Sequence, residues 1–130
     1  EGAQLQGARL ERADLRMTCL RGADLRGADL TGAKLNNADL RDCKLGPLLL
    51  EEDRILPASL AAAKVRYSDL SGADLRRIKA TGADFSYSTL YGADVRHAHF
   101  SGSCFTGARV SESFLTDIDA ADGVVDLDAA

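Results

Sequence analysis

The sequence predicts an all-β solenoid, because apolar residues recur at every fifth position over most of the 130-residue chain. Leucine occupies all of these positions from 5 to 45, and Leu, Val, Phe or Ala occupies them from 60 to 115. A second inward residue, in most repeats a small one, stands two positions earlier. Ten of the twelve glycines stand directly before that second residue. Together these three patterns divide the chain into short repeats of one kind.

A five-residue period excludes an ordinary helix and an ordinary flat sheet. On an α-helix, residues five apart are about 140° out of phase, so the leucines would not form one apolar stripe. On a straight strand, residues five apart point to opposite faces. Within one repeat, however, the two inward positions are two apart and share a face. We therefore expect the chain to bend once per repeat, with glycine at many of the bends.

Short inward-facing segments joined by bends wind into coils, and each coil hydrogen-bonds to the next at a spacing of about 4.8 Å. Like side chains then stack in ladders along the axis and form the core. The residues expected to fill this core are Leu5, Leu10, Leu15, Leu25, Leu30, Leu70, Leu75, Phe85, Leu90, Phe100 and Phe105.

The repeats resemble a known family. The runs GADLR at 22–26 and 72–76 and GADLT at 27–31 are similar to the A(D/N)LXX signature of pentapeptide-repeat proteins. The resemblance covers all but the segment 46–57 and the C-terminal tail. It implies a right-handed quadrilateral parallel β-helix with four five-residue repeats, hence twenty residues, per coil.

One exchange of residue sizes supports stacking at twenty residues. Ile78 takes a small site and Ala80 the large site after it, whereas Ala98 and Phe100, twenty residues on, have the usual order. A close-packed core requires such compensation.

The segment 46–57, GPLLLEEDRILP, interrupts the β-helix predicted over residues 1–116. Continuing the repeat would place Asp53 inward, and an unpaired carboxylate in that core is too costly. The segment is expected to leave the coil as a short helix or a loop. One interpretation is a tolerated insertion that packs its leucines on the coil wall. The other is a partner-binding protrusion carrying Leu48, Leu49 and Leu50.

The C-terminal residues 117–130 are predicted to form an acidic cap or tail. Phe114 is a large apolar residue at a normally outward position, so it either packs under the tail or contacts a second subunit. It is therefore a further candidate partner-binding residue. The expected assembly is a monomer or an end-to-end dimer through the C-terminal end.

The sequence shows no arrangement typical of an enzyme, and we expect no catalytic residues, cofactor or metal. His97 and His99 lack the further ligands that a metal site needs. The three cysteines contain no C-x-x-C pair, and outward Cys19 and Cys104 suit a reducing compartment, so we expect a cytoplasmic protein. No apolar run approaches the ~20 residues of a membrane span. The chain opens inside a repeat at Glu1, which is compatible with a module of a larger protein.

Charge separates two hypotheses about function. The net charge is −4, but residues 111–130 contribute −6, so the repeat body is near +2. Within it, Asp and Arg recur two positions apart, as in Asp24 and Arg26. Some pentapeptide-repeat proteins mimic duplex DNA and bind DNA gyrase, giving quinolone or toxin resistance, but such mimicry needs a strong negative field. The sequence therefore favours a non-catalytic scaffold that binds a protein partner and does not itself bind nucleic acid, with DNA mimicry as the alternative.

Overall fold

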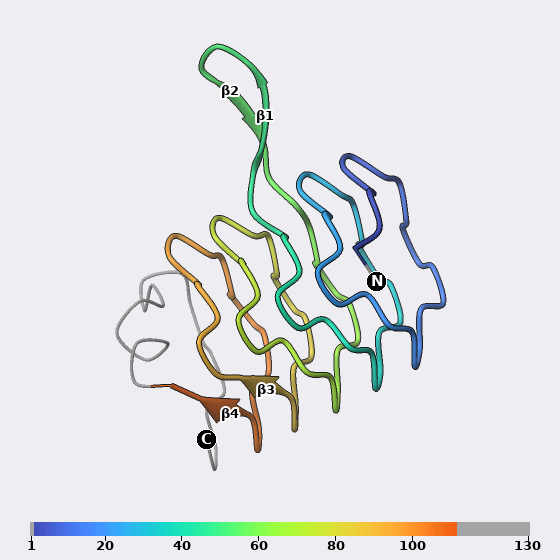
Figure 1. Ribbon diagram of the computed structural model, residues 1–130. Helices are drawn as coiled ribbons and strands as arrows, with labels where there is room; N and C mark the ends of the chain where they lie inside the picture. Colours follow the sequence, from blue (N-terminus) through green and yellow to red (C-terminus); the bar gives the residue numbers. More distant parts are fainter. Residues whose placement is uncertain (1, 112–130) are drawn as a thin grey trace.

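The computed structural model describes residues 2–111, which wind into a right-handed quadrilateral β-helix with no helical segment in that range. Figure 1 shows the coils stacked along one axis, with a hairpin rising from one corner. The hairpin is β1 (Leu48–Glu51) and β2 (Arg54–Leu56). Two short strands of the coils, β3 (Thr89–Leu90) and β4 (Arg109–Val110), pair in parallel. The predicted all-β solenoid is confirmed.

The register between coils is twenty residues, as the repeat implied. Parallel bridges join Gln4 to Asp24 and Asp24 to Lys44. Across the insertion the step becomes thirty residues, as between Asp29 and Ser59, and it returns to twenty from Ser59 to Lys79. The insertion therefore adds ten residues to one coil without shifting the inward positions, because ten is two whole repeats.

The corners of the coil are four-residue turns, and nearly all are closed by a backbone hydrogen bond; at Ser68 the N–H donates to Oγ of Ser88 instead. The N–H of Ala23, for example, donates to the carbonyl of Leu20 at 2.9 Å. The residue before the small inward position has a φ between +56° and +71° at all these turns. Ten of them are glycines, as the sequence indicated, but nine are not, and Ala62 is one of these. An L-residue in this left-handed region costs about 1 to 2 kcal/mol, so stacking between coils holds these corners.

The core is a set of inward ladders. The expected core residues Leu25, Leu30, Leu70, Leu75, Phe85, Leu90 and Phe105 are fully buried, and Phe100 is almost so. Leu5, Leu10 and Leu15 differ from the expectation, because they are only partly buried. Within residues 2–111 their coil packs against a neighbour on one side alone, so the end of the core is open there.

An aromatic cluster fills the core near residue 100. The rings of Phe85 and Phe105 stack with centroids 5.0 Å apart, and Phe100 meets both edge-on. Ile78 and Ala80 are both fully buried in the coil before Phe100. Ala80, which occupies a site that usually holds a large residue, thus lies in the coil that stacks against Phe100.

The insertion is a hairpin, so of the two forms expected for it, a short helix or a loop, the helix was wrong. β1 and β2 pair antiparallel, and Leu48 faces Leu56. The chain leaves and re-enters the coil at the same corner, and a helix of ten residues would end about 15 Å from its start. Two antiparallel strands return the chain to its starting point. The segment does leave the coil, as predicted, and Asp53 is exposed.

Candidate protein-interaction site

The hairpin places its apolar side chains on both of its faces. Leu48 pairs with Leu56, and Leu49 pairs with Ile55. Successive residues of a strand point to opposite faces, so the first pair lies on one face and the second on the other. A register shift between Leu49 and Glu51 leaves Leu50 as an extra residue. A two-stranded hairpin of this kind is only marginally stable alone, and its outer strand edges are open to pairing.

One face of the hairpin rests on the corner of the coil below it. A Cβ built on Gly27 would lie 2.8 Å from the Cβ of Leu48 and 3.2 Å from a methyl carbon of Leu56. A Cβ on Gly7 would lie 3.9 Å from Leu48. The absence of a side chain at Gly27 therefore lets the foot of the hairpin pack directly on the backbone of the coil.

The predicted partner-binding residues occupy different environments. Leu48 is half-buried against the corner, so it anchors the hairpin. Leu49 is 66% exposed, and Leu50 is also exposed. Ile55 and Leu56, which the sequence analysis did not select, are exposed beside them. Ile55 and Leu56 lie beside the selected leucines because the two strands pair, and the sequence did not predict a hairpin. Phe114 and the predicted tail 117–130 lie outside the described residues.

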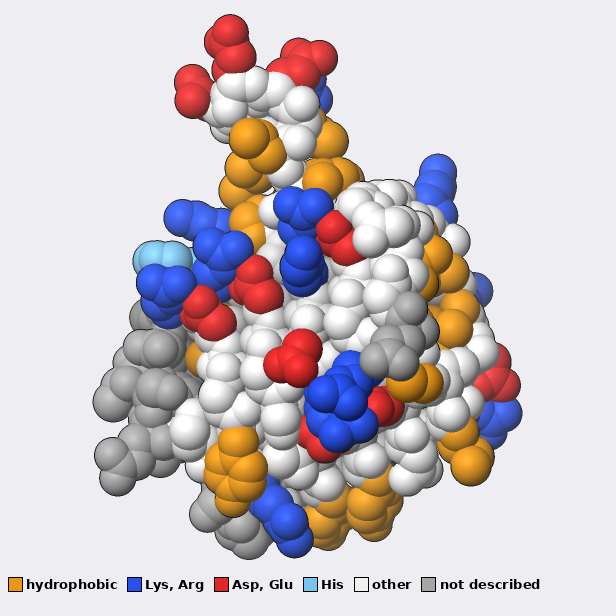
Figure 2. Space-filling model, viewed as in Figure 1, with side chains coloured by type: hydrophobic (Ala, Val, Ile, Leu, Met, Phe, Trp, Pro, Cys, Tyr) orange, Lys and Arg blue, Asp and Glu red, His pale blue; other side chains and the backbone are white. Residues whose placement is uncertain are grey.

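The tip of the hairpin is acidic. Glu51, Glu52 and Asp53 follow one another there, with Arg54 as the adjacent cation. Figure 2 shows acidic side chains at the tip, hydrophobic side chains along the stem, and Lys and Arg side chains on the wall below. The projecting element thus combines an apolar stem with a negative end.

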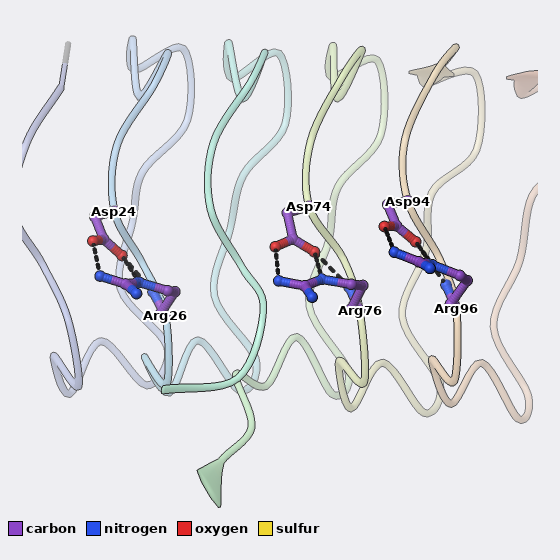
Figure 3. Close-up of polar contacts among 6 residues, drawn as sticks. All are labelled: Asp24, Arg26, Asp74, Arg76, Asp94 and Arg96. Carbon is purple, nitrogen blue, oxygen red and sulfur yellow. Dashed lines mark hydrogen bonds and ion pairs between the residues drawn. The ribbon is translucent and has the colours of Figure 1, made fainter. Parts of the chain in front are cut away.

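The wall of the coil is electrically balanced by short ion pairs. Three of them, Asp24–Arg26, Asp74–Arg76 and Asp94–Arg96, lie along the same wall (Figure 3), and in each the carboxylate accepts bonds from two guanidinium nitrogens. Asp14–Arg16 and Asp39–Arg41 are paired in the same way. Hydrogen bonding to arginine lowers the pKa of Asp14 and the pKa of Asp39 to about 2. The pairing expected from the two-residue spacing is confirmed.

The pairs differ in burial, which leads to a stability prediction. Arg26 and Arg16 make the same 2.7 Å contact with their aspartates, but the Asp24 side chain is 6% exposed and that of Asp14 is 53% exposed. Removing Arg26 leaves a buried carboxylate with Gln6 as its remaining side-chain donor. We expect Arg26→Ala to lower the urea midpoint of unfolding roughly twice as much as the matched Arg16→Ala. Equal losses would show that burial of Asp24 carries no penalty.

The three cysteines differ in burial. Cys43 is buried, and burial raises the pKa of its thiol to about 12, so it is inert at neutral pH. Cys19 is exposed, and Cys104 is half-exposed. In the part of the chain that the structure describes, no three His, Cys, Asp or Glu side chains are grouped so that they could hold a metal ion. No helix in the described range is long and apolar enough to span a membrane.

The geometry defines a class of protein, a β-solenoid that carries one projecting hairpin. The family model for Pentapeptide repeats matches this chain at residues 1–27, 8–46, 58–96 and 81–117. The chain therefore belongs to the pentapeptide repeat family. No curated protein sequence matches it.

Three solved structures are similar to this chain. The chain is 20% identical to a pentapeptide repeat protein (Rfr23) from the cyanobacterium Cyanothece 51142, with a TM-score of 0.69 over 85% of this chain and 86% of that one. It is 25% identical to a pentapeptide repeat protein of the Arabidopsis thaliana thylakoid lumen (TM-score 0.46; 88% and 70% covered). It is 21% identical to QnrB1, a plasmid-mediated fluoroquinolone resistance protein (TM-score 0.46; 83% and 67% covered). The first comparison supports the fold of the coils.

Proposed function

We propose that this chain is a rigid, non-catalytic scaffold that binds a protein partner through the hairpin. The observation that carries the proposal is the pair Leu49 and Ile55, which face each other on the outer side of the hairpin and are both exposed. Burying a leucine or isoleucine side chain yields about 1.5 to 3 kcal/mol, so a partner gains most by covering this face. The open strand edges offer main-chain pairing as well.

The charge of the hairpin sets the chemistry of the partner. Glu51, Glu52 and Asp53 at the tip repel an acidic surface and favour a basic one. The partner expected is therefore a protein with an apolar groove for the stem and cationic side chains where the tip lies. The working compartment proposed is the reducing cytoplasm, since Cys19 is an exposed thiol. We also propose that the chain is either a monomer or an end-to-end dimer. The dimer would form through Phe114 at the C-terminal end.

The hairpin proposal is tested by a double substitution on its outer face. Proteins recovered with the wild-type chain are identified and purified, and their Kd is measured. We expect Leu49→Ser with Ile55→Ser to raise that Kd about 30-fold or more, because two buried apolar side chains are lost. The coil should unfold at the same urea concentration as the wild type. Tyr91→Ser, which alters an exposed apolar residue away from the hairpin, is the control. An unchanged Kd in the double variant contradicts the proposal.

DNA mimicry, the alternative, leads to a prediction of its own. Asp24, Asp74 and Asp94 lie on one wall, and each is paired with an arginine. This wall therefore lacks the continuous negative field that a DNA-binding enzyme would recognise. We expect no potent inhibition of DNA gyrase in a supercoiling assay and no protection of gyrase from quinolones. Any weak binding should depend on the acidic residues 117–130 and disappear at moderate salt. Tight binding that survives deletion of 117–130 would favour DNA mimicry over the scaffold.

A further inference from the structure

A second surface of the coil carries two adjacent lysines on neighbouring rungs. Parallel bridges join Asp14 to Lys34, Lys34 to Lys64, and Lys64 to Asp84. We call this ladder, with the residues that follow it in each coil, the lysine face. In the described range, it is the one bridge that places two lysines side by side. The other bridged lysines differ: Lys44 lies between Asp24 and Asp74, and Lys79 lies between Ser59 and His99.

Neither lysine is in direct contact with an acidic side chain within residues 2–111, although Asp14 and Asp84 lie on the neighbouring rungs. Like charges directly opposite each other in a sheet destabilise it. Asp14, beside Lys34, accepts hydrogen bonds from two guanidinium nitrogens of Arg16. Asp84, beside Lys64, accepts bonds from the hydroxyl and the N–H of Ser86. Within residues 2–111, neither lysine forms an ion pair. The fold thus holds two adjacent positive charges that an anion would relieve.

The lysine face is hollowed around this pair. A depression of about 640 Å³ is lined by Lys34, Lys64, Asn36, Asn37 and Met17, together with the Asp14–Arg16 pair. The amide groups of the asparagines can both donate and accept hydrogen bonds, as a peptide backbone requires. Met17 is among the most exposed apolar side chains of the described chain and adds an adaptable apolar contact.

A tyrosine stack continues the same face beyond the depression. The rings of Tyr67 and Tyr87 are stacked with centroids 5.2 Å apart, and both are exposed. The guanidinium of Arg66 lies 5.7 Å and 5.6 Å from the two ring centroids. Its Nε is buried and forms no hydrogen bond within the described residues, but it lies 3.7 Å from a carboxylate oxygen of Asp84. Tyr and Arg are the residue types that most often dominate binding energy at protein interfaces.

We propose that the lysine face binds an acidic peptide segment in extended conformation, lying along the axis of the solenoid. Carboxylates of the peptide contact Lys34 and Lys64, its backbone lies over Asn36 and Asn37, and an apolar side chain packs on Tyr67. The rungs of the ladder are about 4.8 Å apart, and side chains on one face of an extended peptide repeat every 6.6 to 6.8 Å or so. The flexible lysine stems span that difference. This site is independent of the hairpin.

The binding test uses a fluorescein-labelled decapeptide of alternating Glu and Tyr, followed by fluorescence anisotropy on the whole chain. We expect Lys34→Glu with Lys64→Glu to raise the Kd about 10-fold or more, since two charge-assisted contacts are reversed. Lys44→Glu with Lys79→Glu is the matched control. It makes the same charge change at the same repeat position on other walls, and we expect less than about a threefold effect. Tyr67→Ser should raise the Kd about threefold to fivefold.

Folding is checked separately with the single variant Lys34→Gln, which removes the like charge beside Lys64 without placing a second acid beside Asp14. Its urea midpoint should equal or exceed that of the wild type, while peptide binding falls. The proposal is overturned if the control variant loses binding equally, which would indicate net charge alone. It is also overturned if the peptide does not bind the wild type, or if a labelled ten-residue oligothymidylate binds this face more tightly than the peptide, which would indicate a nucleic-acid site.

Discussion

Replacing Phe85 with Ala is expected to lower the free energy of unfolding by about 3 to 5 kcal/mol, the range for truncating a buried aromatic residue. Phe85 is fully buried, stacks on Phe105 and meets Phe100 edge-on. These rings are fixed by coils on both sides, which hydrogen-bond to each other along the axis and cannot collapse into the cavity. Urea denaturation followed by far-UV circular dichroism measures the loss.

The matched control for Phe85 is Leu15→Ala, in the same inward ladder but at the open end of the core. Leu15 is partly buried, so truncation there removes less apolar surface from a packed environment and should cost about 1 kcal/mol. Comparable losses at the two positions would mean that the first coil is covered in solution and that the open end of the core is an interface.

The second large effect is expected at Gly27, where Ala should cost about 3 kcal/mol. Gly27 and Gly22 share a φ of +69°, so Ala pays the same conformational cost of about 1 to 2 kcal/mol at both. A Cβ at Gly22 meets nothing within 4 Å, whereas one at Gly27 lies 2.8 Å from the Cβ of Leu48. Overpacking adds about 1 to 3 kcal/mol. The difference between the two variants in urea denaturation therefore measures the contact between hairpin and coil.

Two controls test that reading of Gly27. Trypsin should cleave after Arg54 faster in Gly27→Ala than in Gly22→Ala, because the displaced hairpin is less well held. Replacing residues 48–55 by a short Gly-containing turn should leave the β-helix folded and bring the cost of Gly27→Ala closer to that of Gly22→Ala, because it removes Leu48 but not Leu56. If Gly27→Ala costs no more than Gly22→Ala in the intact chain, the hairpin does not rest on the coil in solution.

The inward ladders and the ion pairs follow from the sequence because their causes are local. A residue such as Leu25 points inward through its place in the repeat, and each coil repeats the same geometry. Asp24 and Arg26 are two residues apart on one short segment, so their contact needs no information from the rest of the fold. The twenty-residue register itself came from the family resemblance, and the exchange at Ile78 and Ala80 agreed with it.

The two proposed interaction surfaces depend on the tertiary structure. The sequence placed Leu48 with Leu49 and Leu50, but packing on Gly27 turned Leu48 into an anchor and left Leu49 paired with Ile55 on the open face. Lys34 and Lys64 are thirty residues apart, and they become neighbours only because the ten extra residues of the insertion leave the coil as the hairpin. Such contacts join segments separated by an insertion. A repeat pattern specifies which residues face inward, but which outward side chains meet depends on where the chain leaves the coil and returns.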